Sequence, residues 1–159
     1  MKLKSFILAI LTMVISSCLS MNQNQLINVV EDIVAQEEIS VSYLERLTNH
    51  KFYESDITRK NVLSMGEKFT SYESKNPDIA NYRLRIKKNE PKTGILVITP
   101  KEKSIKLDDI LSRLEKIDYI ITPNLGAGTE TLSYKIESKE MFFEFDAASE
   151  LLNYVSIHF

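Results

Sequence analysis

Cysteine and histidine, the side chains most often used for metal binding and nucleophilic or base catalysis, are rare in the 159-residue sequence. Cys18 is the only cysteine, and the two histidines, His50 and His158, lie far apart in the sequence. A zinc site needs several cysteine or histidine ligands at suitable spacing, so we expect no metal and no other cofactor. No serine stands in the G-x-S-x-G setting of a hydrolase nucleophile. The sequence therefore predicts no catalytic residues and a protein that is not an enzyme.

Phosphate binding by the loop Gly126-Ala127-Gly128 is a second chemical possibility. A phosphate-binding loop needs more glycines and a helix directly after it, because the amides at the start of that helix point at the anion. Here Thr129 leads into a pattern that is typical of a strand. We interpret the loop as a flexible connection between two strands.

The residues before Cys18 have the composition of a secretory signal. Lys2 and Lys4 give a positive start, residues 6–15 are apolar, and Ser16 and Ser17 are small. This order of charge, apolar run and small residues is the export pattern. The apolar run is about half the roughly 20 residues that a membrane-spanning helix needs. We therefore predict that residues 1–17 are a signal peptide and not a permanent membrane anchor.

The segment Ile15-Ser16-Ser17-Cys18 resembles a bacterial lipobox, which is an aliphatic residue, two small residues and a cysteine. The resemblance implies cleavage before Cys18, diacylglycerol on its sulfur, and a further acyl chain on the new amino group. Two or three acyl chains hold a protein at a membrane for long times, whereas one holds it marginally. Leu19 stands where enteric lipoproteins retained at the inner membrane tend to have Asp, which favours an outer-membrane location facing the periplasm. The alternative is an ordinary cleaved signal followed by an incidental cysteine.

Composition limits what the remaining chain can be. Removing the two lysines of the signal changes the formal net charge from −2 to −4, which argues against nucleic-acid binding. With a single cysteine no internal disulfide can form, so packing must stabilise the fold. We expect residues 18–25 to be a lipidated tether and residues 26–159 to be a single domain.

Periodic apolar residues predict an α+β domain. Helices are expected from Leu26, from Ser42 (with Glu45 in a capping box) and over Leu107–Leu114. Residues 71–81 have a loop composition, and Val62, Met65 and Phe69 are compatible with a short helix. Strands are predicted at Tyr82–Lys87, Gly94–Thr99, Tyr119–Thr122, Leu132–Glu137, Met141–Phe145 and through Val155, Ile157 and Phe159. The result is an antiparallel or mixed sheet of about five or six strands, with the N-terminal helices and one helix between strands packed on it.

The apolar run Ile95–Ile98 predicts a central strand that is covered on both faces. Arg83, Arg85 and Lys87 fall on one face of the strand before it, where they could meet an acidic partner or lipid phosphates. The alternative is a solvated face paired with Glu137 or Glu144. Leu125, in the loop between Pro123 and Glu130, either inserts into a partner or folds back onto its own core.

The expected function follows from the predicted lipid anchor and from the lack of catalytic residues. A small lipid-anchored domain without a catalytic constellation is expected to be a periplasmic lipoprotein that binds a protein partner at the membrane surface. In its size, its tether and its lack of a catalytic motif, the predicted protein resembles small immunity lipoproteins. This resemblance implies that it neutralises an envelope-targeted toxin. Two alternatives stay open: an envelope assembly or scaffold lipoprotein, and a hydrolase whose site the sequence does not reveal.

Overall fold

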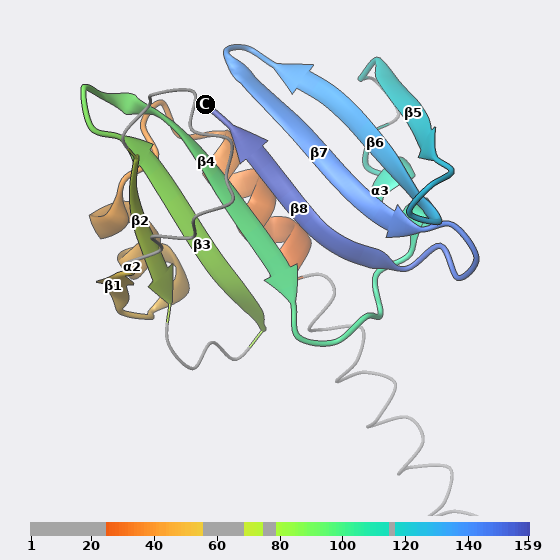
Figure 1. Cartoon of the computed structure of the whole chain (residues 1–159), viewed down its shortest axis with the longest axis horizontal. Coiled ribbons are helices and arrows are strands. Elements are labelled where there is room, and N and C mark those ends of the chain that lie inside the picture. Colours follow the sequence, from red (N-terminus) through yellow and green to blue (C-terminus); the bar gives the residue numbers. More distant parts are fainter. Residues whose placement is uncertain (1–24, 56–68, 75–78, 115–116) are drawn as a thin grey trace, which may run out of the picture.

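A computed structural model describes residues 25–55, 69–74, 79–114 and 117–159 of the chain. Its centre is an eight-stranded antiparallel sheet with strand order β1-β2-β3-β4-β8-β7-β6-β5 (Figure 1). The strands are β1 Phe52–Glu54, β2 Phe69–Ser74, β3 Ala80–Lys87, β4 Glu90–Pro100, β5 Tyr119–Asn124, β6 Thr129–Ile136, β7 Lys139–Asp146 and β8 Leu152–His158. The predicted α+β class is confirmed, and the sheet is antiparallel throughout.

The sheet consists of two four-stranded halves with the same topology. In each half, strands that follow one another in sequence are neighbours in space, first β1 to β4 and then β5 to β8. The halves join where β4 pairs with β8, with Leu96 opposite Ile157 and Val97 opposite Ser156. Helical segments precede each half: residues 25–34 and α2 (Val41–Thr48) before the first, and α3 (Leu107–Leu111) before the second.

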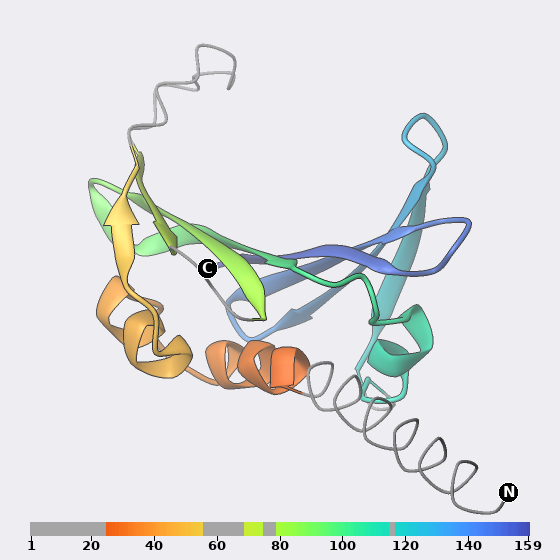
Figure 2. The same cartoon turned by 90° about the horizontal axis from the view of Figure 1, so that it is seen from below.

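All of these helices lie on one face of the sheet (Figure 2). Burial on that face follows the predicted helical stripes, because Ile33, Leu44 and Ile110 are almost fully inaccessible to solvent. Strand residues that face them, such as Leu84 and Leu96, are equally buried. The helices and alternate strand residues together form the hydrophobic core. The opposite face of the sheet carries no described helix; we call it the open face.

The predicted number of strands was wrong, because β1 and β2 were missed. No element was predicted for β1, and β2 overlaps residues 71–81, which were interpreted as a loop. Phe69–Ser74 forms a strand although Thr, Ser and Glu make up most of it. All six of its residues are half-buried, so no alternation of polar and apolar residues marks β2. Phe69, predicted to be helical, begins β2, whereas Val62 and Met65 lie outside the described residues.

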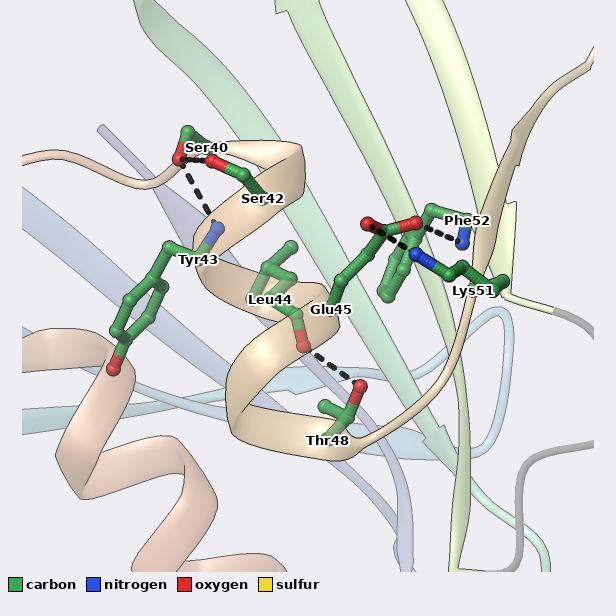
Figure 3. Close-up of polar contacts among 8 residues, drawn as sticks. All are labelled: Ser40, Ser42, Tyr43, Leu44, Glu45, Thr48, Lys51 and Phe52. Atoms are coloured by element: carbon green, nitrogen blue, oxygen red, sulfur yellow. Dashed lines mark hydrogen bonds and ion pairs between the residues drawn. The ribbon is translucent and has the colours of Figure 1, made fainter.

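The start of α2 also differs from the prediction (Figure 3). The N-cap is Ser40, whose side chain accepts a hydrogen bond from the Tyr43 amide at 3.3 Å; Ser42 lies inside the helix. Glu45 closes no capping box, because its carboxylate accepts from the Phe52 amide at 3.1 Å and from Lys51 Nζ at 3.3 Å. It therefore links the helix to the first residue of β1.

Strand β4 is central, as predicted, but it is not covered on both faces. Leu96 and Ile98 are fully buried under the helices, whereas Ile95 and Val97 are only half-buried on the open face. Both faces of this strand are apolar for different reasons. One side packs in the core, and the other contributes apolar side chains to the open face.

Candidate functional site: the open face of the sheet

Strand register defines a single row of side chains across the open face. Directly opposed residues of neighbouring antiparallel strands share a face, so each pairing fixes the next member of the row. The row crosses all eight strands, and its members, in order from β1 to β5, are Tyr53, Glu73, Arg83, Val97, Ser156, Phe142, Ser133 and Ile120. We call this set the central row.

The β5 end of the central row is hollowed. Ser133 is a small residue between the larger side chains of Phe142 on β7 and Ile120 on β5. Two adjacent hollows of about 380 Å³ and 600 Å³ both have Ser133 and Phe142 in their linings. Ile120 lines the first and Leu125 the second, and these side chains are 68% and 92% exposed. Apolar side chains beside hollows of this kind can receive side chains from a binding partner.

Leu125 lies in the turn between β5 and β6 and borders this hollowed end of the face. Its 92% exposure shows that it does not fold back onto the core, so that alternative was wrong. Gly126 and Gly128 follow it in the turn, and Gly128 adopts a positive φ of 65°, which glycine tolerates without strain. The side chain is therefore available for contact with another molecule.

The basic residues Arg83, Arg85 and Lys87 share the open face of β3, as the alternation predicted. Arg83 Nε lies 2.7 Å from Glu73 Oε1, and Lys87 Nζ lies 3.0 Å from Glu90 Oε1. Arg85 forms no ion pair with any residue that the structure describes. Two of the three cations are thus partly neutralised within the sheet, which weakens the case for a continuous basic ridge.

The acidic partners suggested for these cations were wrong. Glu144 accepts a hydrogen bond from the Tyr154 hydroxyl at 2.9 Å, and Glu137 lies in the turn after β6 with a positive φ of 54°. Strand order explains the error, because β2 and β4 flank β3. The same order places three strands, β4, β8 and β7, between β3 and the β5–β6 hairpin that carries Leu125. The predicted contact residues border one face but do not form one patch.

Ser156 and His158 give the open face its only close pairing of a hydroxyl with an imidazole among the described residues. Ser156 Oγ lies 3.1 Å from His158 Nε2, and the Phe142 ring centroid lies 4.8 Å from the imidazole. Burial lowers the pKa of His158, while the nearby Glu140 carboxylate acts in the opposite direction. A serine and a histidine at this distance are the minimum of a nucleophile and base pair.

Several features argue against hydrolysis at this pair. Ser156 is only 7% exposed and lies within a strand that pairs on both sides, so its neighbouring amides face β4 and β7. Oxyanion stabilisation requires amides or side-chain donors that are free to point at the substrate. No carboxylate among the described residues hydrogen-bonds to His158 to orient it. The pair is better explained as part of the packing around Phe142.

A separate apolar pocket of about 310 Å³ lies on the helical side. Residues 25–34, α3 and strands β6 and β7 line it, and the Arg113–Glu31 ion pair of 3.0 Å lies at its polar part. Burial, with a smaller contribution from Glu31, raises the pKa of Tyr134 in its wall to about 12. This phenol therefore stays protonated at any physiological pH.

From the sequence, Arg83, Arg85, Lys87 and Leu125 were predicted as possible contact residues, whereas the hollow at Ser133 was missed. Alternation could have placed Ser133 and Phe142 on the outward faces of their strands. Their apposition depends on the β6–β7 register, which the sequence alone did not specify. Cys18, the predicted lipidation site, lies outside the described residues.

Comparison of the chain with protein-family models, with curated proteins and with solved structures found no match. Within the described ranges, no helix is long and apolar enough to span a bilayer. The same residues contain no group of three or more His, Cys, Asp or Glu side chains that could hold a metal ion. The residues of the open face are therefore the main indication of function.

Proposed function

We propose that the chain is a periplasmic lipoprotein, anchored to the outer membrane through Cys18, whose folded domain binds a protein partner with its open face. The observation that carries the proposal is the hollow at Ser133 between Phe142 and Ile120, bordered by the 92% exposed Leu125. Exposed apolar clusters with a polar rim mark interaction sites on soluble domains. Lys135 and Glu140, paired at 3.8 Å, contribute to such a rim.

The specific form that we propose is an immunity or inhibitor protein that neutralises an envelope-targeted toxin. Its support is a small domain with two strongly exposed apolar residues, Ile120 and Leu125, at the β5 end of the open face. Arg83 and Arg85 at the β3 side add charge that could orient a partner, because charged groups at the rim of an interface mainly affect encounter and specificity. A scaffold lipoprotein of an envelope assembly would use the same face, so identification of the partner distinguishes the two.

Lipid attachment can be tested directly. Cells that express the full chain are grown with radioactive palmitate, and the labelled protein is followed through membrane fractionation. We expect label on the wild-type chain in the membrane fraction and none on Cys18→Ser. A soluble, unlabelled wild-type chain would contradict the anchor.

Partner binding through the open face can be tested by crosslinking and affinity capture of the full chain from envelopes. Leu125→Asp should release the captured partner, because it places a charge in the apolar part of the surface. Gln36→Asp introduces the same charge at an exposed position on the helical side and should leave capture unchanged. Equal capture by wild type and both variants would remove the open face from the proposal.

The Ser156–His158 pair is the one specific observation that favours a hydrolase. A fluorophosphonate probe labels activated serines, so it should label the full chain if Ser156 is a nucleophile. We expect no labelling at that residue, because the serine is buried and lacks oxyanion donors. Labelling that disappears in Ser156→Ala would establish the hydrolase alternative.

A further inference from the structure

The two edges of the sheet differ in how well they are protected from pairing with another chain. Strand β1 has three residues and carries Glu54, whereas β5 has six residues and pairs only with β6. Every residue of β5 is exposed, and no helix or strand of the described residues lies beyond it in Figure 1. An edge strand presents unpaired backbone amides and carbonyls that can bind a further strand.

The side chains of β5 add apolar surface to this edge. Tyr119, Ile120 and Ile121 are 43%, 68% and 39% exposed. Natural proteins usually protect long edges with lysine, other charges, proline or bulges. Residues 119–122 contain none of these residue types, and Pro123 comes only as the fifth residue of the strand. The first four residues therefore form an unprotected apolar edge.

We propose that β5 pairs antiparallel with β5 of a second copy of this chain, forming a continuous sixteen-stranded sheet. The two-fold axis lies perpendicular to the sheet, so both copies have their open faces on the same side. Directly opposed residues must then lie on the same face, which allows only a few registers. This self-association does not require the partner proposed above, although Ile120 also lines the hollow assigned to that partner.

Pro123 selects among those registers. In one register, Ile121 lies opposite Ile121 of the second copy. Tyr119 would then lie opposite Pro123, which has no N–H to donate. In the other register, Ile120 lies opposite Ile120 of the second copy. Tyr119 then lies opposite Ile121, and Pro123 falls outside the paired residues. This second register places all three exposed apolar side chains of the edge in apolar cross-strand pairs.

Charge supports a second copy as the occupant. In the Ile120-centred register, the first charged residue before the strand, Asp118, lies opposite Thr122 and not opposite another acid. No like charges are therefore opposed at the new strand pair, which would otherwise be destabilised. A symmetric pair of this kind also leaves the helices of both copies on one side of the joined sheet, because the axis is perpendicular to it.

Sedimentation velocity on the full chain in detergent tests the association. We expect a concentration-dependent dimer, and Ile120→Lys should raise its dissociation constant by a factor of about 30 or more. Leu125→Lys adds the same charge outside the paired residues and should leave the dimer intact. A monomer at about 100 µM, far above the range of specific complexes, would overturn the proposal. The proposal would also be overturned if Leu125→Lys disrupted the dimer and Ile120→Lys left it intact.

A disulfide tests the register. Opposed residues of antiparallel strands have Cα atoms about 4.5–5.5 Å apart, which suits a disulfide. In a Cys18→Ser background, Ile120→Cys should form a crosslinked dimer under mild oxidation. The matched variant Thr122→Cys should not, because its two copies would be separated by several residues. Crosslinking of Thr122→Cys alone contradicts the register. Ile121 lies on the edge but lines neither hollow, so loss of a captured partner by Ile121→Lys in a monomeric chain would assign the edge to that partner.

Discussion

At the scale of single residues, Gly94 shows how a side chain can be excluded by its neighbours. A Cβ atom at this position would contact the Arg85 carbonyl oxygen and would lie 2.7 Å from Phe159 Cζ. Gly94 and Phe159 also exchange backbone hydrogen bonds of 2.8 and 3.0 Å, which fix the C-terminal residue against β4. The close approach of Phe159 therefore requires glycine.

We expect Gly94→Ala to lower the free energy of unfolding by about 1–3 kcal/mol, the usual cost of overpacking. Gly126→Ala is the matched control, because its new Cβ atom would meet nothing closer than Asn124 Oδ1 at 3.9 Å. Urea denaturation followed by circular dichroism measures both changes. Equal stability of the two variants would contradict the packing of Phe159 over Gly94.

His158 predicts a specific pH dependence of stability. Burial lowers its pKa in the folded state below the ordinary value of 6.5, so the unfolded chain binds a proton more readily. Its contribution to stability is therefore fully present above about pH 6.5 and is lost as the pH falls from there through the folded-state pKa. His158→Gln should flatten this part of the profile of unfolding free energy against pH. A wild-type profile identical to that of the variant would contradict the shift.

At the scale of elements, the N-cap residue of α2 differs between the sequence prediction, Ser42, and the structure, Ser40. Ser40→Ala should lower the free energy of unfolding by about 0.5–2 kcal/mol, because the Tyr43 amide loses its acceptor. Ser42→Ala should have a smaller effect, since Ser42 contributes only a side-chain contact of 3.2 Å to Ser40. Thermal denaturation of both variants decides between the two caps. A larger loss of stability in Ser42→Ala than in Ser40→Ala would show that Ser42 is the N-cap, as the sequence predicted.

Elements with strong periodicity were predictable from the sequence, and weakly patterned ones were not. The stripe that contains Val30 and Ile33 marked the first helix, and the alternation around Leu84 marked β3, because burial on one face imposes these periods. β1 and β2 have no such pattern and are stabilised by pairing with a neighbour. Propensity is a weak guide to strands that pairing stabilises.

The candidate site was less predictable than the elements that carry it. Leu125 and the cations of β3 could be named from their own strands and loops. The hollow at Ser133 could not, because it depends on which residues of β5 and β7 lie opposite β6. Register depends on contacts between segments distant in sequence, and a shift of one residue would turn Ser133 to the other face.

At the scale of the whole molecule, the fold separates two surfaces. The helices cover one face of the sheet, and the β5–β6 hairpin rises on the other side (Figure 2). The described chain begins with the helical residues 25–34, so the predicted tether joins the domain on the helical side. A domain held at the membrane from this side would leave its open face accessible to partners.

Site-specific photocrosslinking in living cells tests most directly whether this open face is the working surface. A photoreactive residue is placed in the full chain at Leu125 or Thr99 on the open side, or at Glu37 or Glu38 on the helical side; all four positions are exposed. We predict that only the open-side positions form an adduct with one partner protein. This adduct should be heavier than the chain alone and should differ in mass from a dimer of the chain. The same adduct from the helical side, with none from the open side, would contradict the account.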